Sequence, residues 1–124
     1  MKARFSKNNE VDVILIYPKT GTDFGATIAT PHSVLAVAAP LHKEGYKVKI
    51  IDQRTSYNWR LQLTEYLEKR PICVGISSMT GTQIHFALEA AKIIRNHSDG
   101  KVPIVWGGPH PSILPEQTLE SRYV

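Results

Sequence analysis

The chain has 124 residues, with 15 Lys and Arg against 11 Asp and Glu, which gives a formal net charge of +4. Hydrophobic residues make up 42% and charged residues 21%, a balance that argues against a disordered chain and favours one globular domain. The basic residues never cluster into a run, so we expect no nucleic-acid partner, and no apolar stretch approaches the roughly 20 residues of a membrane-spanning helix.

The chain starts with a polar segment, residues 1–10, which lacks the apolar core of a secretory signal and which we expect to be disordered. The first strand, residues 11–17, is a β-branched run that Pro18 stops. Further strands are expected at 47–52, 72–77 and 102–106. The first and third runs are almost continuously apolar, which is typical of parallel strands covered on both faces.

A long Gly/Thr-rich loop, residues 18–30, connects the first strand to the first helix, and loops of this length are often functional or mobile. The helix is expected over residues 31–44, with Thr30 as its N-cap and Pro31 in its first turn. Pro40 removes a backbone hydrogen bond inside this segment, so we expect it to kink the helix or split it in two.

Three more helices are expected. The second spans residues 58–69, and a short fourth one starts near Pro115. The third begins with a capping box of Thr80 and Gln83 and ends before Gly100. Its apolar stripe would consist of Ile84, Leu88, Ala91 and Ile94.

Alternating strands and helices with mostly short connections predict an α/β fold, a doubly wound parallel sheet of the flavodoxin-like or Rossmann-like kind with strand order 2-1-3-4. Such a sheet usually has a fifth strand, which would begin near residues 121–124. We therefore expect this strand to be missing or incomplete and the chain to be a fragment of a longer protein. The fourth strand would then be an exposed edge that favours self-association.

Ligands of open parallel sheets bind at the carboxyl ends of the strands. Here these ends are rich in Gly, Ser and Thr and poor in carboxylates, which predicts a pocket for a bulky ligand with amide or phosphate groups rather than an acid–base catalytic site. We predict no catalytic residue and no metal ligand. The candidate binding residues are Thr20, Gly21, Ser77, Ser78, Met79, Thr80, Gly107, Gly108, Pro109 and His110.

Other chemistries fit less well. Ser77 stands where a phosphoacceptor domain needs an acidic residue, and dinucleotide and Walker A fingerprints are absent. Thr20 and Gly21 give partial support to flavin mononucleotide, but their loop does not lead straight into a helix. The five histidines are not paired at metal-ligand spacing. Cys73 is the single cysteine, which excludes a disulfide framework or a self-contained iron–sulfur cluster and favours a reducing, cytoplasmic setting.

One motif is more specific. Ser77-x-Met79 is followed after 27 residues by Gly107-Gly108, which matches the S-x-L…G-G pattern of cobalamin-binding domains with Met in place of Leu. The flanking sequence resembles the N-terminal cobalamin-binding domain of radical S-adenosylmethionine enzymes, above all anaerobic magnesium-protoporphyrin IX monomethyl ester cyclases and related methyltransferases. The similarity covers about residues 11–124.

The resemblance implies roles for the candidate residues. Ser77 would hydrogen-bond the dimethylbenzimidazole tail of cobalamin, and Met79 would pack against it. Gly107 and Gly108 would leave room for the nucleotide loop, and we expect the fold to tolerate a side chain at Gly108 better than the ligand does. The resemblance also implies that Thr20, Gly21 and His110 lie near the corrin rim.

Cobalamin proteins with a histidine lower ligand carry D-x-H-x-x-G after the first strand. This chain has Asp23 and then His32, which do not fit that spacing, so cobalamin should bind base-off without a protein histidine. The resemblance implies a small-molecule cofactor module that is inactive alone, with S-adenosylmethionine and a [4Fe-4S] cluster held in a further domain. The alternative is a flavin mononucleotide-binding or interaction module that does not bind cobalamin.

Overall fold

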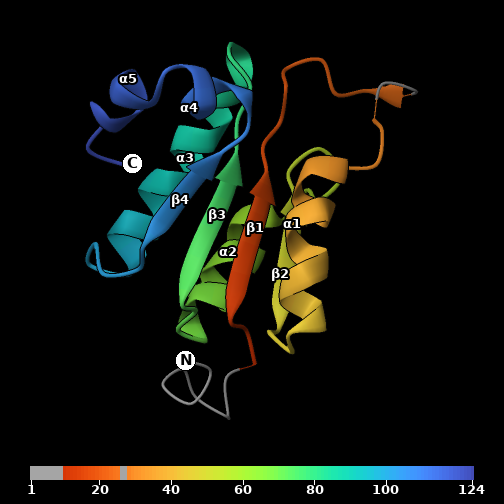
Figure 1. The fold of residues 1–124 in the computed structure, drawn as a ribbon, viewed down its shortest axis with the longest axis vertical. Helices are drawn as coiled ribbons and strands as arrows, with labels where there is room; N and C mark the ends of the chain where they lie inside the picture. Colours follow the sequence, from red (N-terminus) through yellow and green to blue (C-terminus); the bar gives the residue numbers. More distant parts are fainter. Residues whose placement is uncertain (1–9, 26–27) are drawn as a thin grey trace.

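The structure is a computed structural model that describes residues 10–25 and 28–124. Its centre is a parallel four-stranded sheet in the order β2-β1-β3-β4, which confirms the predicted doubly wound, flavodoxin-like arrangement (Figure 1). The strands are β1 (Val13–Tyr17), β2 (Val48–Asp52), β3 (Cys73–Ser77) and β4 (Ile104–Gly107). The expectation of disorder at the N-terminus falls on residues 1–9, which lie outside the described residues.

The strands start one or two residues later than the sequence predicts. Val11 and Asp12 are buried ahead of β1, where the Asp12 carboxylate accepts a hydrogen bond of 2.7 Å from the backbone N–H of Lys47. β4 begins only after Pro103, whose carbonyl still accepts a hydrogen bond from Val74 but whose nitrogen has no hydrogen to donate. The side-chain hydrogen bond of Asp12 and the missing N–H of Pro103 therefore explain why β1 and β4 start late.

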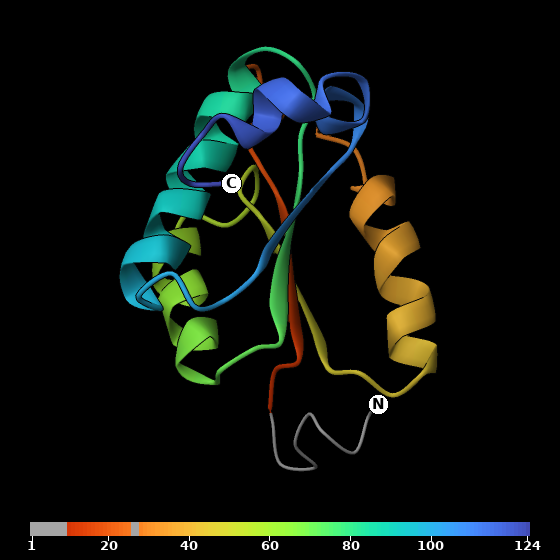
Figure 2. The same cartoon turned by 60° about the vertical axis from the view of Figure 1, so that its left-hand side comes forward.

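Helices lie on both faces of the sheet. α1 (His32–Lys43) covers β1 and β2 on one face, while α2 (Trp59–Glu68) and α3 (Thr82–His97) lie together on the opposite face (Figures 1 and 2). Two short helices, α4 (Pro109–Ile113) and α5 (Pro115–Leu119), follow β4, and the sequence predicted only the second of them. None of the described helices combines the length and the apolar character needed to cross a membrane.

The predicted N-cap of α1 is wrong, and so is a split of the helix at Pro40, one of the two outcomes expected there. Pro31, not Thr30, occupies the N-cap position, and no side chain there bonds the first turn. The helix also continues through Pro40 to Lys43 instead of splitting. Pro40 lies in the last turn, so it removes a single helical hydrogen bond near the end, and its own carbonyl still accepts one from the N–H of Glu44.

The predicted capping box of α3 does not form either. The N-cap is Gly81, at φ +106°, and the Thr80 hydroxyl is instead 3.1 Å from Nδ1 of His110. The buried face is also rotated from the predicted stripe, since Ile84 and Leu88 are half-buried. The helix residues that are fully buried are Gln83, Ala87, Ala90, Ala91 and Ile94.

The two sheet faces have cores of different size. The larger core lies under α2 and α3 and includes Ile14, Ile16 and Trp59. The smaller one lies under α1 and is built on Val13, Leu15, Val34 and Ala38. Because α1 packs on β1 and β2, the adjoining surface of β3 and β4 on this face is left partly open, and the side chain of Val105 is 59% exposed there.

Candidate functional site

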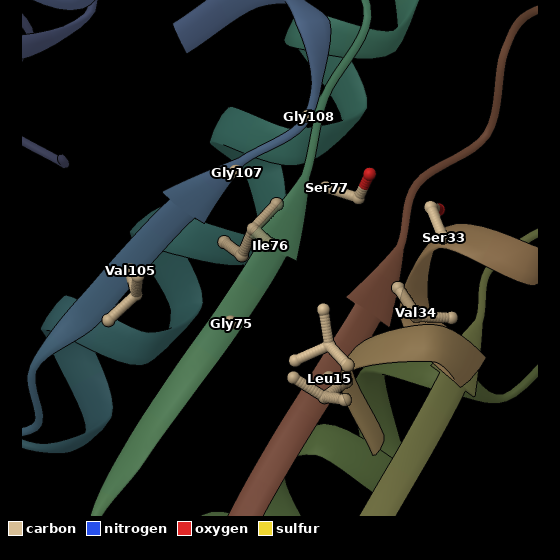
Figure 3. A pocket seen from close by; sticks show the side chains of 10 residues that line it. Leu15, Ser33, Val34, Gly75, Ile76, Ser77, Val105, Gly107 and Gly108 are labelled. Carbon is tan, nitrogen blue, oxygen red and sulfur yellow. The ribbon is translucent and has the colours of Figure 1, made fainter. Parts of the chain in front are cut away.

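A cavity of about 170 Å³ lies on the α1 side of the sheet and opens toward the carboxyl ends of β3 and β4 (Figure 3). Three of the predicted residues line it: Ser77, Gly107 and Gly108. The other lining residues were not predicted, and they are Leu15, Ser33, Val34, Val37, Gly75, Ile76 and Val105. One wall is thus the first half of α1, and the floor is the sheet itself.

The floor is a trough created by a missing side chain. Gly75 in the middle of β3 pairs with Leu15 of β1 on one side and Val105 of β4 on the other. Alternate residues of a strand point to the same face, so the next floor position is Ser77, which pairs with Gly107. A Cβ on Gly75 would lie 2.7 Å from Cδ2 of Leu15, so the Leu15 side chain uses the space that the missing side chain leaves.

The two glycines of the Gly-Gly turn differ. Gly108 has φ +92°, and a Cβ there would lie 2.9 Å from the backbone oxygen of Ser78. Gly107 has no such conformation, and a Cβ there would meet nothing within 4 Å. The fold therefore requires a glycine at 108, where β4 turns into α4, and the comparison with the ligand's tolerance of a side chain stays a prediction. Gly107 is the one that faces open space.

Ser78 holds the ends of β3 and β4 together and does not line the cavity. It is fully buried, its N–H donates to the carbonyl of Gly107, and its carbonyl accepts from the N–H of His110. Its hydroxyl lies 3.3 Å from the carbonyl oxygen of Met79. The backbone of Ser78 therefore fixes where β4 turns into α4.

The remaining predicted residues at this end lie outside the cavity wall. His110 is buried at 7% exposure, and its Nδ1 pairs with the hydroxyl of Thr80 across two segments. Met79 is 40% exposed, and Pro109 is the first residue of α4. None of these four residues is among those that line the cavity.

Thr20 and Gly21 are also absent from the cavity lining. Both form hydrogen bonds with a carboxylate. Asp23 accepts hydrogen bonds from both backbone N–H groups, at 2.6 and 3.1 Å, and from the Thr20 hydroxyl at 2.6 Å. Burial tends to raise the pKa of Asp23, but these hydrogen bonds outweigh burial and hold the pKa below its ordinary value. An ionised carboxylate therefore occupies the donors that a phosphate would need.

Two buried glutamines that the sequence analysis did not assign to the site fasten the loops around it. Gln83 donates to the carbonyl of Pro18 at 3.0 Å and accepts from the N–H of Met79 at 2.7 Å. Gln53, 1% exposed, accepts from the N–H of Lys19 at 3.1 Å. A glutamine directly after an apolar strand is the signal that would have identified Gln53. Together they tie the carboxyl ends of β1, β2 and β3 to one another.

A second polar cluster lies at the same carboxyl ends of the strands. The guanidinium of Arg54 forms a two-pronged ion pair with Asp52 at 2.8 and 2.9 Å and stacks over the ring of Tyr17. It also donates to the carbonyl of Ala29 at 2.7 Å, which anchors the end of the long loop. The hydrogen bond and charge of the Asp52 carboxylate raise the pKa of Arg54, so the guanidinium stays charged.

The described residues do not provide a metal centre or a reactive thiol. No group of three His, Cys, Asp or Glu side chains capable of holding a metal ion occurs among them. Cys73 is half-buried in β3, and burial raises the pKa of its thiol. The site is therefore suited to binding a ligand, because backbone, aliphatic side chains and hydroxyls form its surface.

Comparison with known proteins gives two matches. Residues 24–124 match the model of the B12 binding domain. A Pyrococcus horikoshii protein named as an uncharacterized methyltransferase is 31% identical over 110 residues, which cover 86% of this chain and 24% of that protein. The chain thus spans about a quarter of that relative's length. No solved structure matches.

Proposed function

Since the chain belongs to the B12-binding domain family, we propose that residues 11–124 form the cobalamin-binding module of a radical S-adenosylmethionine enzyme of the methyltransferase or oxidative cyclase type. The observation that carries the proposal is the trough over Gly75, which continues past Ser77 to the open space at Gly107. Strand interiors rarely carry glycine unless a ligand or another backbone approaches closely. The nearest group to a Cβ on Gly75 would be Cδ2 of Leu15, whereas the volume that faces Gly107 is open.

The residues of the trough fit the tail of cobalamin. A cavity of about 150 Å³ lined by aliphatic side chains accepts a benzene ring, so a cavity of about 170 Å³ has the size for an aromatic ring system. Leu15, Val34 and Val37 would exclude water from the ring, and the Ser77 hydroxyl would bond its nitrogen. Cobalamin, when bound, supplies a cobalt centre that can carry a methyl group.

We further propose that cobalamin binds base-off, without a protein histidine on cobalt. None of the ten residues that line the cavity is a histidine. The nitrogen Nδ1 of His110 is already paired with Thr80. Outside the trough, the cofactor would contact Thr20, Gly21, Met79, Thr80, Pro109 and His110. Ser78, which is fully buried, would only hold the turn in place.

The module would have no turnover alone. S-adenosylmethionine and a [4Fe-4S] cluster would bind to a further domain, in keeping with a relative about four times as long whose name is that of a methyltransferase. Cytoplasmic location belongs to the same proposal, because the single cysteine is free. Flavin mononucleotide is disfavoured because the Asp23 carboxylate occupies the loop that would cradle its phosphate.

Visible-absorption titration tests the proposal. Hydroxocobalamin added to the purified chain should bind with the spectrum of base-off cobalamin, and flavin mononucleotide should not bind. Asp23→Asn provides a control, because removal of the carboxylate charge should leave cobalamin binding intact. Binding of flavin but not cobalamin would establish the alternative and overturn the proposal.

A further inference from the structure

The walls of the trough contain almost no polar side chain. Of the residues that line it, only Ser33 and Ser77 carry a polar side chain, and none carries a charge. Leu15, Val34 and Val105 provide aliphatic surface on three sides (Figure 3). The cavity therefore offers two hydroxyls to any polar atom that enters it.

The shape of the trough is that of a flat slot. Gly75 carries no side chain, and Cδ2 of Leu15, its partner on β1, lies over it, 2.7 Å from where a Cβ would be. At Gly107, nearer the carboxyl ends of the strands, a Cβ would meet nothing within 4 Å, so the floor is open there. A planar ring can lie against such a floor, whereas a bulky saturated group cannot use it fully.

Planar bases differ in how many hydrogen bonds they require. A benzimidazole joined to ribose through one nitrogen keeps one ring nitrogen that needs a donor. An adenine joined in the same way keeps three ring nitrogens and an amino group. Two hydroxyls can satisfy the first base but not the second, and each polar atom buried without a partner weakens binding.

We propose that this trough selects among cobamides by their lower base, accepting a benzimidazole and rejecting a purine. This inference rests on the proposed cobalamin function and adds a specificity to it. Ser33 and Ser77 supply the polar side chains of the trough, and the Val105 side chain forms one aliphatic wall. Val105 is the residue to test, because it is 59% exposed on the edge strand and a polar substitution there leaves the core intact.

The experiment compares three probes on the full 124-residue chain: cobalamin, the cobamide with adenine as lower base, and cobinamide, which has no base. We expect the adenine form to bind about tenfold or more weaker than cobalamin. Val105→Gln supplies an amide that can pair with adenine, so this variant should narrow the ratio. Leu61→Gln, at a 58% exposed position on α2, is the matched control and should leave the ratio unchanged. Thermal melting verifies that each variant folds.

The outcomes separate the two proposals. Equal affinity for both cobamides in the unmodified chain would overturn base selection and leave cobalamin binding intact. Absence of binding to any cobamide would overturn the proposed function itself. A ratio that Val105→Gln does not change would also refute the role of this wall. Cobinamide should bind Val105→Gln as it binds the unmodified chain, because it places no base in the trough.

Discussion

Neighbouring residues of β3 point to opposite faces of the sheet and have different roles. Val74 is fully buried and packs beneath α2 and α3, whereas Gly75 and Ser77 line the cavity on the α1 side. One face is closed by two helices and the other by only one (Figure 2). We therefore expect the closed face to supply most of the stability, whereas the half-open face is available for a ligand.

The largest expected effect is on the closed face. Ile16 is fully buried in the larger core, so Ile16→Ala should lower the free energy of unfolding by about 2–5 kcal/mol through lost burial and a new cavity. Val105→Ala on the open face should cost less than about 1 kcal/mol, because most of that side chain is already in water. Urea denaturation measures both. Equal losses would contradict the division between the faces.

The two glycines of the Gly-Gly turn separate stability from ligand binding in the same way. Gly108→Val should cost about 2 kcal/mol or more, because it adds strain at positive φ and a clash with the backbone of Ser78. Gly107→Val should leave melting nearly unchanged but abolish cobalamin binding, since its side chain would project into open space. Melting and cobalamin titration on both variants decide. A folded Gly107→Val protein that binds cobalamin normally would refute the assignment of that space to the ligand.

Much of this site could be predicted from the sequence because it depends on strand order. The strands could be located from their apolar runs, and their order brings Ser77 and Gly107 together at one edge. The different roles of Gly107 and Gly108 could not be predicted, because they depend on a backbone angle and on how closely β3 approaches. The pairing of Thr80 with His110 was missed because local capping rules ignore a partner 30 residues away.

The α1 wall could not be predicted for a related reason. Val34 and Val37 lie on an apolar helix, but which strands that helix covers depends on how it packs across the sheet. Gly75 gave a signal that was overlooked, because a glycine within a buried strand often marks a close approach. Periodicity therefore finds the elements, whereas the cavity arises from their packing.

A smaller effect is expected at the carboxyl-end loop of β1. The pKa of Asp23 is lowered in the folded state, so its stabilisation is complete above the unfolded value of about 4 and is lost as the pH falls through the folded value. Asp23→Asn should cost roughly 1 kcal/mol at pH 7, discounted for partial exposure, and progressively less as the pH falls through the folded pKa. Urea denaturation from pH 7 to pH 2 measures the gap. A gap that stays constant with pH would show that the Asp23 charge does not stabilise the loop.

The smallest expected effect concerns the outer edge of the open face. We propose that β4 mediates weak self-association, because it lies at the edge of the sheet and carries no charged side chain, whereas the opposite edge strand β2 carries Lys49. So short an edge buries far less than the roughly 1,000 Å² of a stable interface, so the dissociation constant should be on the order of 0.1–1 mM. Val105→Lys places a charge on this edge and should abolish the association in sedimentation equilibrium, while Leu61→Lys on α2 should not. A chain that stays monomeric at millimolar concentration, or a Val105→Lys variant that associates as before, would mean that β4 needs no partner and that the open face matters only for the ligand.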